Sequence, residues 1–286
     1  PYGEYDTNDT ITIASDSVDV EMWGTIKAQN FSGPAIDIDP GGDGADYSRI
    51  YGRYFRISVE RETLAWTTSA GIKYDGVGWS SVNSGVRFVN LNQCEIIIAK
   101  AQQFDIGVDI QCIGGSFTFN KFDVYACRRN QIGVRIQTPS YFGNLGYFND
   151  NLWNGGDFRV DGSISGLNNV SRYWLVVDDA QDFDNNIFTK VSCELNTVNY
   201  SITTGEGPCI FMSGFCFGNE FLHIRGESSD GFARIERGTQ SGQKYPAYNK
   251  FTAGAGFEEA YTWIDDNTPT LLNFVQNYRS AGEIAS

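Results

Sequence analysis

Two acidic residues occupy matching places in two copies of a repeated segment of this 286-residue chain. Glu95 is the third residue after Asn92, and Asp123 is the third residue after Asn120. If the two copies stack as neighbouring strands, their carboxyl groups lie about 5 Å apart. Two carboxylates at that separation can break a glycosidic bond, and their repulsion raises one pKa and so supplies a proton donor. We therefore predict that Glu95 and Asp123 form a catalytic pair, with Tyr125 beside them as a substrate contact.

Other residues remain open as alternatives to this pair. A later group of acids could supply one or both carboxylates, namely Asp157, Asp178, Asp182 and Glu194. Cleavage by β-elimination would instead need a base and a positive charge to neutralise a uronate. The candidates for those roles are Lys190, Arg128 and Arg129. Hydrolysis is the favoured reaction.

Aromatic and acidic residues gather around an inserted segment, YFGNLGYF at 141–148. Flat rings can stack on the apolar faces of sugars, and carboxylates can accept bonds from sugar hydroxyls. We predict sugar contacts from Tyr141, Tyr147, Trp153, Asp150 and Asp157. The alternative is that these aromatic rings form a subsidiary core beneath the loop.

The sequence indicates no metal site and no cofactor. An acidic, glycine-rich loop around Asp39 resembles a calcium loop, but Gly41 and Ser48 stand where that template needs acidic ligands. The single histidine, His223, excludes any site that needs two.

The candidate residues lie on a repeat, and the repeat predicts the fold. Polar anchors recur at Asn92, Asn120, Asn185, Asn219 and Asn249, each followed by strand-like runs whose apolar residues alternate with polar ones. One more copy fits between Asn120 and Asn185. A repeat of about 30 residues with a hydrophobic period of two is typical of a solenoid of strands. We predict an all-β, right-handed parallel β-helix of roughly eight to ten coils. Its expected parts are entry strands and a first coil or junction at 1–49, the β-helix at 50–265, and a terminal strand and tail at 266–286.

Alternation also predicts which side chains face inward. Phe122, Val124 and Ala126 should face the core, as should Cys94, Ile96 and Ile98 on the preceding coil. Cys127 should face outward. On the next strands, Asp109 and Arg135 should form an exposed ion pair of small energetic worth. The asparagine anchors should bond from coil to coil at the turns.

Composition limits the partners. The net charge of −14 argues against nucleic acid and anionic membranes. No apolar run approaches about 18 residues, so no membrane insertion is expected. Six cysteines without a CxxC pair indicate reduced, mostly buried thiols. The chain shows no signal peptide and begins without Met, so we expect an excised fragment.

The recurring N-x-[F/I/C] anchors with long, irregular coils resemble the pectate-lyase-like parallel β-helix, and in particular bacteriophage tailspike depolymerases, over residues 50–265. The resemblance implies a homotrimer on the virion, at the phage tail, that binds and cleaves capsular or O-antigen polysaccharide. No lyase motif or calcium-binding nonapeptide accompanies it. A non-catalytic receptor-binding or structural spike is the alternative, followed by a secreted carbohydrate-active enzyme or adhesin.

Overall fold

The computed structural model describes residues 3–29, 33–41, 49–61, 83–139, 145–159, 173–194, 208–227, 231–236, 238, 246–253, 262–264 and 274–277. Every regular element among these residues is a β-strand. Within the same residues no helix is long and apolar enough to cross a membrane.

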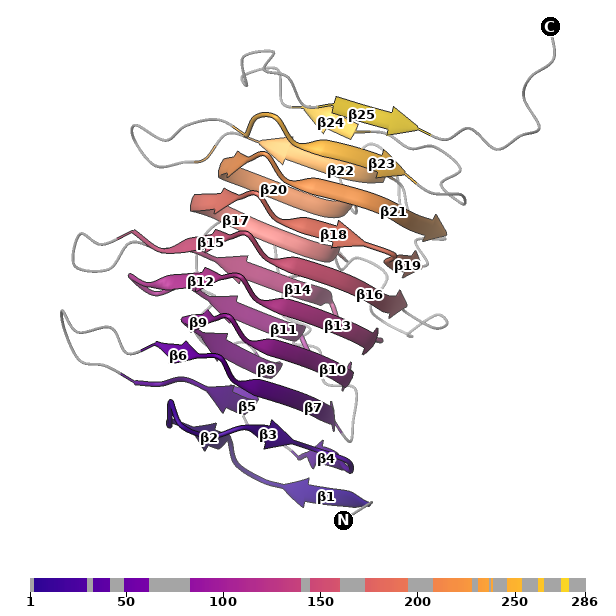
Figure 1. Cartoon of the computed structure of the whole chain (residues 1–286). Coiled ribbons are helices and arrows are strands. Elements are labelled where there is room, and N and C mark those ends of the chain that lie inside the picture. The colour runs from indigo at the N-terminus through magenta and orange to yellow at the C-terminus, as the bar shows by residue number, and fades with distance from the viewer. Residues whose placement is uncertain are drawn as a thin grey trace, which may run out of the picture.

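The strands form a stack of coils, and each complete coil has three sides (Figure 1). Side 1 consists of β1 (Glu4–Thr7), β3 (Val20–Glu21), β4 (Thr25–Ala28), β7 (Tyr54–Arg61), β10 (Glu95–Gln102), β13 (Lys121–Ala126), β16 (Leu152–Arg159), β18 (Ile187–Thr189), β19 (Ser192–Glu194), β21 (Glu220–Glu227), β23 (Lys250–Ala253) and β25 (Phe274–Asn277). Side 2 consists of β2 (Ile11–Ile13), β5 (Pro34–Ile38), β8 (Ser84–Val89), β11 (Ile106–Gln111), β14 (Ile132–Gln137), β17 (Tyr173–Asp184), β20 (Pro208–Phe217), β22 (Gly231–Glu236) and β24 (Thr262–Ile264). Side 3 consists of β6 (Ile50–Tyr51), β9 (Leu91–Asn92), β12 (Ser116–Thr118), β15 (Tyr147–Asn149) and the C-terminal ends of β17 and β20.

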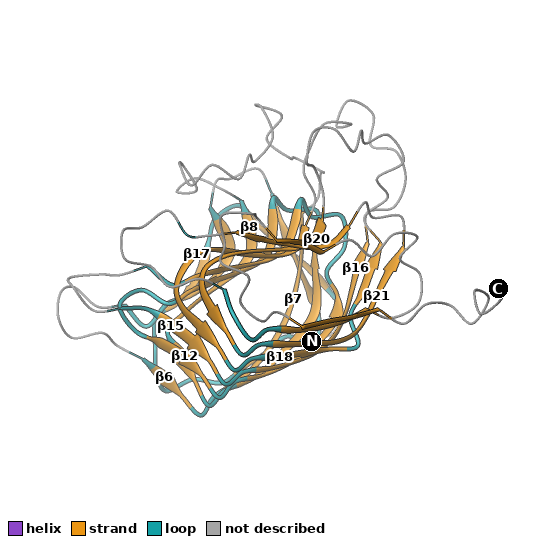
Figure 2. Ribbon diagram, turned by 90° about the horizontal axis from the view of Figure 1, so that it is seen from above, coloured by secondary structure: helices purple, strands orange, loops and turns teal. Residues whose placement is uncertain are grey.

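Neighbouring strands pair in parallel along the stack, as in β10 with β13 and β11 with β14. The chain runs along side 1, crosses to side 2 and returns through side 3, one coil above the last (Figure 2). The coils wind in the right-handed sense, and the path through side 1 passes β1, β4, β7, β10, β13, β16, β18, β21, β23 and β25. The predicted right-handed parallel β-helix is therefore confirmed.

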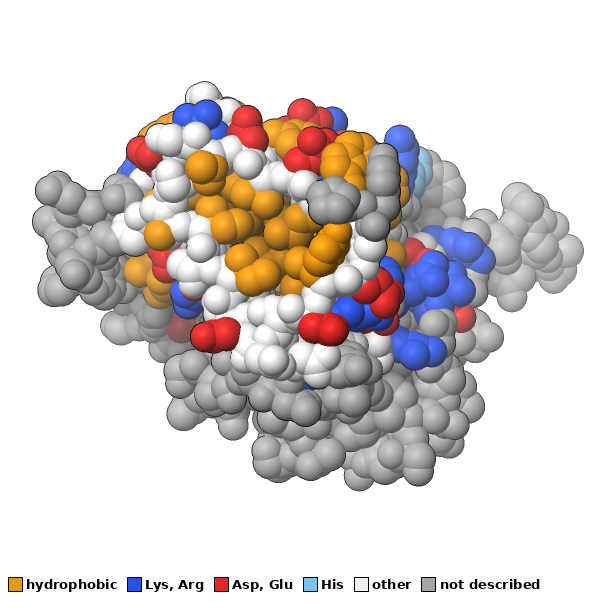
Figure 3. Space-filling view, turned by 90° about the horizontal axis from the view of Figure 1, so that it is seen from below, with side chains coloured by type: hydrophobic (Ala, Val, Ile, Leu, Met, Phe, Trp, Pro, Cys, Tyr) orange, Lys and Arg blue, Asp and Glu red, His pale blue; other side chains and the backbone are white. Residues whose placement is uncertain are grey.

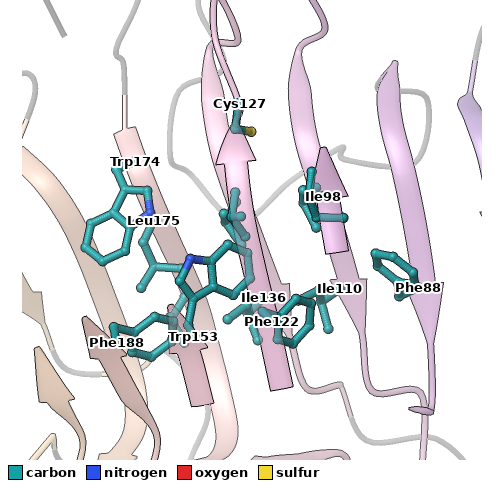
Figure 4. Close-up of a cluster of buried hydrophobic side chains, with 14 of the residues drawn as sticks. Phe88, Ile98, Ile110, Phe122, Cys127, Ile136, Trp153, Trp174, Leu175 and Phe188 are labelled. Carbon is teal, nitrogen blue, oxygen red and sulfur yellow. The ribbon is translucent and has the colours of Figure 1, made fainter. Parts of the chain in front are cut away.

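Inward side chains fill the stack with columns of apolar residues. Phe122 stacks on Trp153 with ring centroids 4.6 Å apart, and Phe221 stacks on Phe251 at 4.9 Å. Figure 4 shows this interior, with Trp153 between Phe122 and Phe188. Five of the six predicted inward residues are buried, namely Cys94, Ile96, Ile98, Phe122 and Val124. The sixth, Ala126, is half-buried, and its register partners Lys100 and Asp157 carry side chains in ion pairs.

An asparagine ladder runs beside the core at the turn between sides 3 and 1. Its members are Asn120, Asn151, Asn186, Asn219 and Asn249, all buried. Asn151 shows the pattern: its Oδ1 accepts from the backbone N–H and from Nδ2 of Asn120, both at 3.0 Å. Its own Nδ2 donates to Phe117 O at 2.8 Å and to Asn186 Oδ1 at 3.0 Å. The ladder thus ties each coil to the next through buried amides.

Two predicted anchors were misplaced. Asn186, not Asn185, belongs to the ladder, and the place expected for Asn92 is taken by Cys94, whose backbone N–H donates to Asn120 Oδ1 at 2.9 Å. Asn151 supplies the anchor of the additional copy.

The residue before each ladder position has a left-handed backbone. This turn column consists of Gly52, Gln93, Phe119, Asp150, Asn185, Gly218 and Tyr248, with φ from 52° to 67°. Such φ values are uncommon for residues other than glycine, so their recurrence marks one turn geometry repeated on successive coils. Side chains on either side of this turn therefore stand above one another in register.

Two predictions about orientation were wrong. Cys127 is buried because the chain turns toward side 2 directly after Ala126, where β13 ends. Arg135 donates from Nε and Nη2 to Asp109 Oδ1 and Oδ2 at 2.8 and 2.7 Å. The two side chains are only 2% and 4% exposed, so this is a buried, bidentate ion pair rather than an exposed one.

The N-terminal end of the stack presents apolar side chains to its surroundings (Figure 3). Ile13, Val20, Met22 and Ile26 pack against the core there and are only partly buried. The end of the core is therefore less well covered than its middle.

Candidate functional site

Three acids converge on the outer surface of side 3. Asp182 and Asp184 point outward from β17 on either side of Phe183, which is fully buried. Asn149 of the preceding coil is the register partner of Asp184, and Asp150 follows it in the turn column. We call Asp150, Asp182 and Asp184 the acidic cluster. The two coils and the turn between sides 3 and 1 hold its members together.

Asp184 is the titratable group that this arrangement changes most. Burial raises its pKa, and the negative charges of Asp182 and Asp150 raise it further, to about 6. Its Oδ1 is buried and receives no hydrogen bond within the described part of the chain. An unsatisfied carboxylate oxygen beside two acids favours the protonated form. Asp184 can therefore hold a proton at mildly acidic pH.

Aromatic side chains lie on both sides of the acidic cluster along the stack. Phe217 is the register partner of Asp184 on the following coil, and its ring lies 4.9 Å from that of Tyr248 on the next. Phe217 is 36% exposed and Tyr248 is 53% exposed. Phe119 is exposed in the turn column directly below Asp150. Exposed aromatic rings grouped in this way are unusual on a protein surface. They are suited to contacts with flat apolar faces of a ligand.

Tyr147 and Asp150, two of the predicted sugar contacts, lie at this site. Tyr147 directly precedes Phe148, the register partner of Phe183, so it stands beside Asp182 and is half-buried. Asp150 is exposed. Within the described residues no group of three His, Cys, Asp or Glu side chains is arranged to hold a metal ion.

Glu95 and Asp123 lie elsewhere, on the outer surface of side 1. The prediction that they occupy equivalent positions is wrong: Glu95 is the register partner of Lys121, and Asp123 that of Ile97. Lys121 Nζ lies 3.2 Å from Glu95 Oε1 and 2.8 Å from Asp123 Oδ2, so one lysine binds both acids.

The electrostatics of side 1 also differ from those expected of a catalytic pair. Burial alone would raise the pKa of Asp123, but hydrogen bonds from Lys121 and Asn154 lower it below its usual value. Tyr125 is exposed on the same strand, two residues beyond Asp123. A catalytic role for Glu95 and Asp123 stays a prediction. The two observations expected to support it, equivalent positions on neighbouring coils and a raised pKa of one acid, are not found.

The remaining predicted sugar contacts have different surroundings. Trp153 is 1% exposed, and its Nε1 donates to Gly155 O at 3.1 Å. It packs in the main core of the stack between Phe122 and Phe188 (Figure 4), so it does not contact sugar and does not belong to a subsidiary core beneath the loop. Asp157 binds Arg128 and lies 3.3 Å from Arg159 Nε. Tyr141 lies outside the described residues.

Most of the remaining alternative acids and bases also have different surroundings. Arg129 is exposed at a left-handed turn that follows β13. Glu194 Oε2 lies 3.4 Å from Arg159 Nε, and Asp157 neutralises Arg128. Lys190 is exposed at a left-handed turn on side 1. The side chain of Asp178 lies outside the described residues.

Sequence reasoning missed Asp184. The motif DFDNN at 182–186 contained the signal, because alternation around an inward Phe183 puts both acids outward. The raised pKa, however, depends on Asp150, which is distant in sequence.

The fold and this surface define a right-handed parallel β-helix protein with acids and exposed aromatic rings on one side. No family model matches the chain, and no curated protein matches it. Among solved structures, the chain is similar to ORF18 of Geobacillus virus E2, with 12% identity and a TM-score of 0.49. That match covers 97% of this chain and 51% of the viral chain, so this chain spans about half the length of the viral one.

The chain is also similar to DFA-IIIase from Arthrobacter chlorophenolicus A6 in complex with GF2, with 9% identity, a TM-score of 0.34, and coverage of 91% of this chain and 70% of that chain. A mutant of the same enzyme gives 9% identity, a TM-score of 0.32, and coverage of 91% and 72%. At these identities and TM-scores the likeness assigns no role to any residue of this chain.

Proposed function

We propose that this chain is a phage tailspike-type domain that binds bacterial capsular or O-antigen polysaccharide and hydrolyses it at the acidic cluster. The observation that carries the proposal is Asp184, a carboxyl group with a pKa raised to about 6 beside two further acids. Glycoside hydrolysis needs one carboxyl group that is protonated and one that is ionised. We assign the first role to Asp184 and the second to another acid of the acidic cluster.

In this mechanism Asp184 donates its proton to the glycosidic oxygen as the bond to the leaving sugar breaks. Asp182 is the partner carboxylate, because it points outward from the same strand two residues earlier. The Cα atoms of residues two apart on a strand are about 6.6 Å apart. We assign Asp182 the role of general base that activates a water, which gives inversion at the anomeric carbon. Phe217 and Tyr248 hold sugar rings on the adjacent coils.

A binding spike without catalysis is the second candidate. The exposed pair of Phe217 and Tyr248 favours it, because ring stacking needs no proton donor. β-Elimination is less well supported, since Arg128, one of its candidate groups, is neutralised by Asp157.

In the first test the protein is spotted on lawns of capsule-typed bacteria, and a halo marks a susceptible strain. The second test measures the reducing ends that the protein releases from the polysaccharide of that strain. Asp184→Asn should lower turnover at least about 100-fold with folding unchanged by circular dichroism. Glu95→Gln and Asp123→Asn test the alternative pair on side 1, and loss of turnover in these variants but not in Asp184→Asn would move the catalytic site there. Full activity of Asp184→Asn would exclude the acidic cluster. Binding by the wild type without release of reducing ends would leave the binding spike, and an ultraviolet-absorbing unsaturated product would indicate elimination.

The proposed assembly is a homotrimer on the virion. Leu152 and Ile187, exposed register partners on side 1, are suited to packing against a neighbouring copy. Light scattering should give three times the chain mass at micromolar concentration, and Ile187→Glu should lower that mass. A wild-type monomer would exclude the homotrimer without bearing on the acidic cluster.

A further inference from the structure

Two cysteine side chains meet at the corner between sides 1 and 2. Cys193 lies in β19 and Cys209 near the start of β20, and both are fully buried. Their Sγ atoms are 2.7 Å apart, although the residues are 16 positions apart in sequence. No other pair of the six cysteines has a recorded sulfur–sulfur contact among the described residues.

Register between coils explains why these two side chains face each other. On the preceding coil, Phe158 is the partner of Cys193, and Trp174 precedes Leu175, the partner of Ile210. Trp174 therefore stands at the position of Cys209. The rings of Phe158 and Trp174 are 5.8 Å apart. The side chains at these two positions, one on side 1 and one on side 2, thus face each other on both coils. The contact of Cys193 with Cys209 is therefore a consequence of how the backbone turns between the two sides.

A sulfur separation of 2.7 Å is shorter than contact between two thiols and longer than the roughly 2.05 Å of a disulfide. The two sulfurs therefore already face each other at the corner. We propose that Cys193 and Cys209 are an oxidisable pair that forms a disulfide within one coil. The cross-link would close the segment 194–208 between side 1 and side 2.

The oxidant would be a small-molecule disulfide such as oxidised glutathione. One cysteine thiolate attacks it, forms a mixed disulfide and releases one glutathione thiolate. The second cysteine then attacks the protein sulfur, the Cys193–Cys209 bond forms and the second glutathione leaves. The two thiol protons pass to the two glutathione thiolates, so two protein thiols are oxidised as one glutathione disulfide is reduced.

Burial makes the first attack slow. Both sulfurs are buried, and burial raises the pKa of the Cys193 thiol well above its usual value, with a further contribution from Cys209. A thiol in that state exchanges only when the corner opens. Since β19 has only three residues, mild denaturant should speed the reaction by opening this corner before the whole stack unfolds.

The experiment equilibrates the whole folded chain in glutathione buffers with and without low urea. It then quenches with acid, alkylates the remaining thiols and maps the linked peptides. Oxidised protein should carry two fewer alkyl groups, with one linked peptide joining Cys193 to Cys209. Closing a loop of this size should raise the thermal midpoint by about 5 °C. Cys127→Ser is the matched control, because Cys127 is also buried but bonds Asn130 and Gly133 O.

Cys127→Ser should keep the linked peptide and the thermal shift upon oxidation. Cys193→Ser and Cys209→Ser should each lose both. Six alkylated cysteines under every condition, or linked peptides joining other cysteines, would overturn the proposal. Because the readouts are mass and stability, they do not depend on any activity toward polysaccharide.

Discussion

The backbone N–H of Asp184 donates to Oδ1 of Asn149 on the preceding coil, at 3.3 Å. The two residues are also register partners on side 3. This contact fixes the end of β17 beside the turn that carries Asp150. The acidic cluster is therefore held by the stacking of the coils.

The first prediction concerns the pH dependence of stability. The pKa of Asp184 rises from 3.8 to about 6 on folding, so the native state binds the proton more tightly. Its contribution to stability therefore falls as pH rises from about 4 to about 6. Asp184→Asn should raise the free energy of unfolding at pH 7 by on the order of 1 kcal/mol, a value discounted for the partly solvated side chain. At pH 3.5 the gain should vanish. Urea unfolding at both pH values measures it, and an equal gain at both would contradict the prediction.

The second prediction compares two adjacent asparagines. Asn186 is buried and binds Asn151, Asn219 and Phe148 O. Asn186→Ala leaves buried donors and acceptors without partners and should cost about 3 kcal/mol. Asn185 is exposed with φ 52°, a conformation that glycine adopts without strain. Asn185→Gly, the matched control, should change stability by less than about 1 kcal/mol. Denaturant midpoints give both values, and equal losses would refute the ladder.

The third prediction concerns the buried ion pair. Removing one partner leaves an uncompensated charge, so Asp109→Leu or Arg135→Met should each cost about 3–5 kcal/mol. The double variant Asp109→Leu/Arg135→Met should cost less than the sum, because no buried charge is left. A double-mutant cycle measures the coupling. Additive losses would show that the two side chains act independently.

The fourth prediction separates core from surface aromatics. Trp153→Ala should lower the free energy of unfolding by about 3–5 kcal/mol, because it removes a buried ring. Tyr248→Ala should leave the thermal midpoint nearly unchanged and weaken oligosaccharide binding. Calorimetry and titration on folded protein distinguish the two. If Tyr248→Ala destabilises the chain and spares affinity, its ring serves packing only.

The sequence predicted the fold because the repeat and its alternation are local features. Asn120, Asn219 and Asn249 were correct anchors for the same reason. Asn185 was one residue off because two asparagines are adjacent, and only the left-handed turn separates their roles. The anchor predicted at Asn92 was wrong because Cys94, two residues later, occupies the place below Asn120. Glu95 and Asp123 therefore differ by two residues in register and are not equivalent.

Electrostatics were less predictable because they depend on neighbours in other coils. Asp184 owes its pKa to burial and to acids that include Asp150, 34 residues earlier in the sequence. The alternation that pointed Asp109 away from the core of the stack carried no information about its burial, and Asp109 is only 3% exposed.

The repeated turn before each ladder asparagine makes whole coils interchangeable. Removing residues 120–150 would join Phe119 to Asn151, and Asn151 would then take over the bonds that Asn120 makes to Leu91 O and Cys94 N. A lineage of such chains can therefore grow or shrink in steps of one coil, about 4.8 Å along the axis. Each step changes the length of the stack by one coil and leaves the side chains of the coils away from the junction in place.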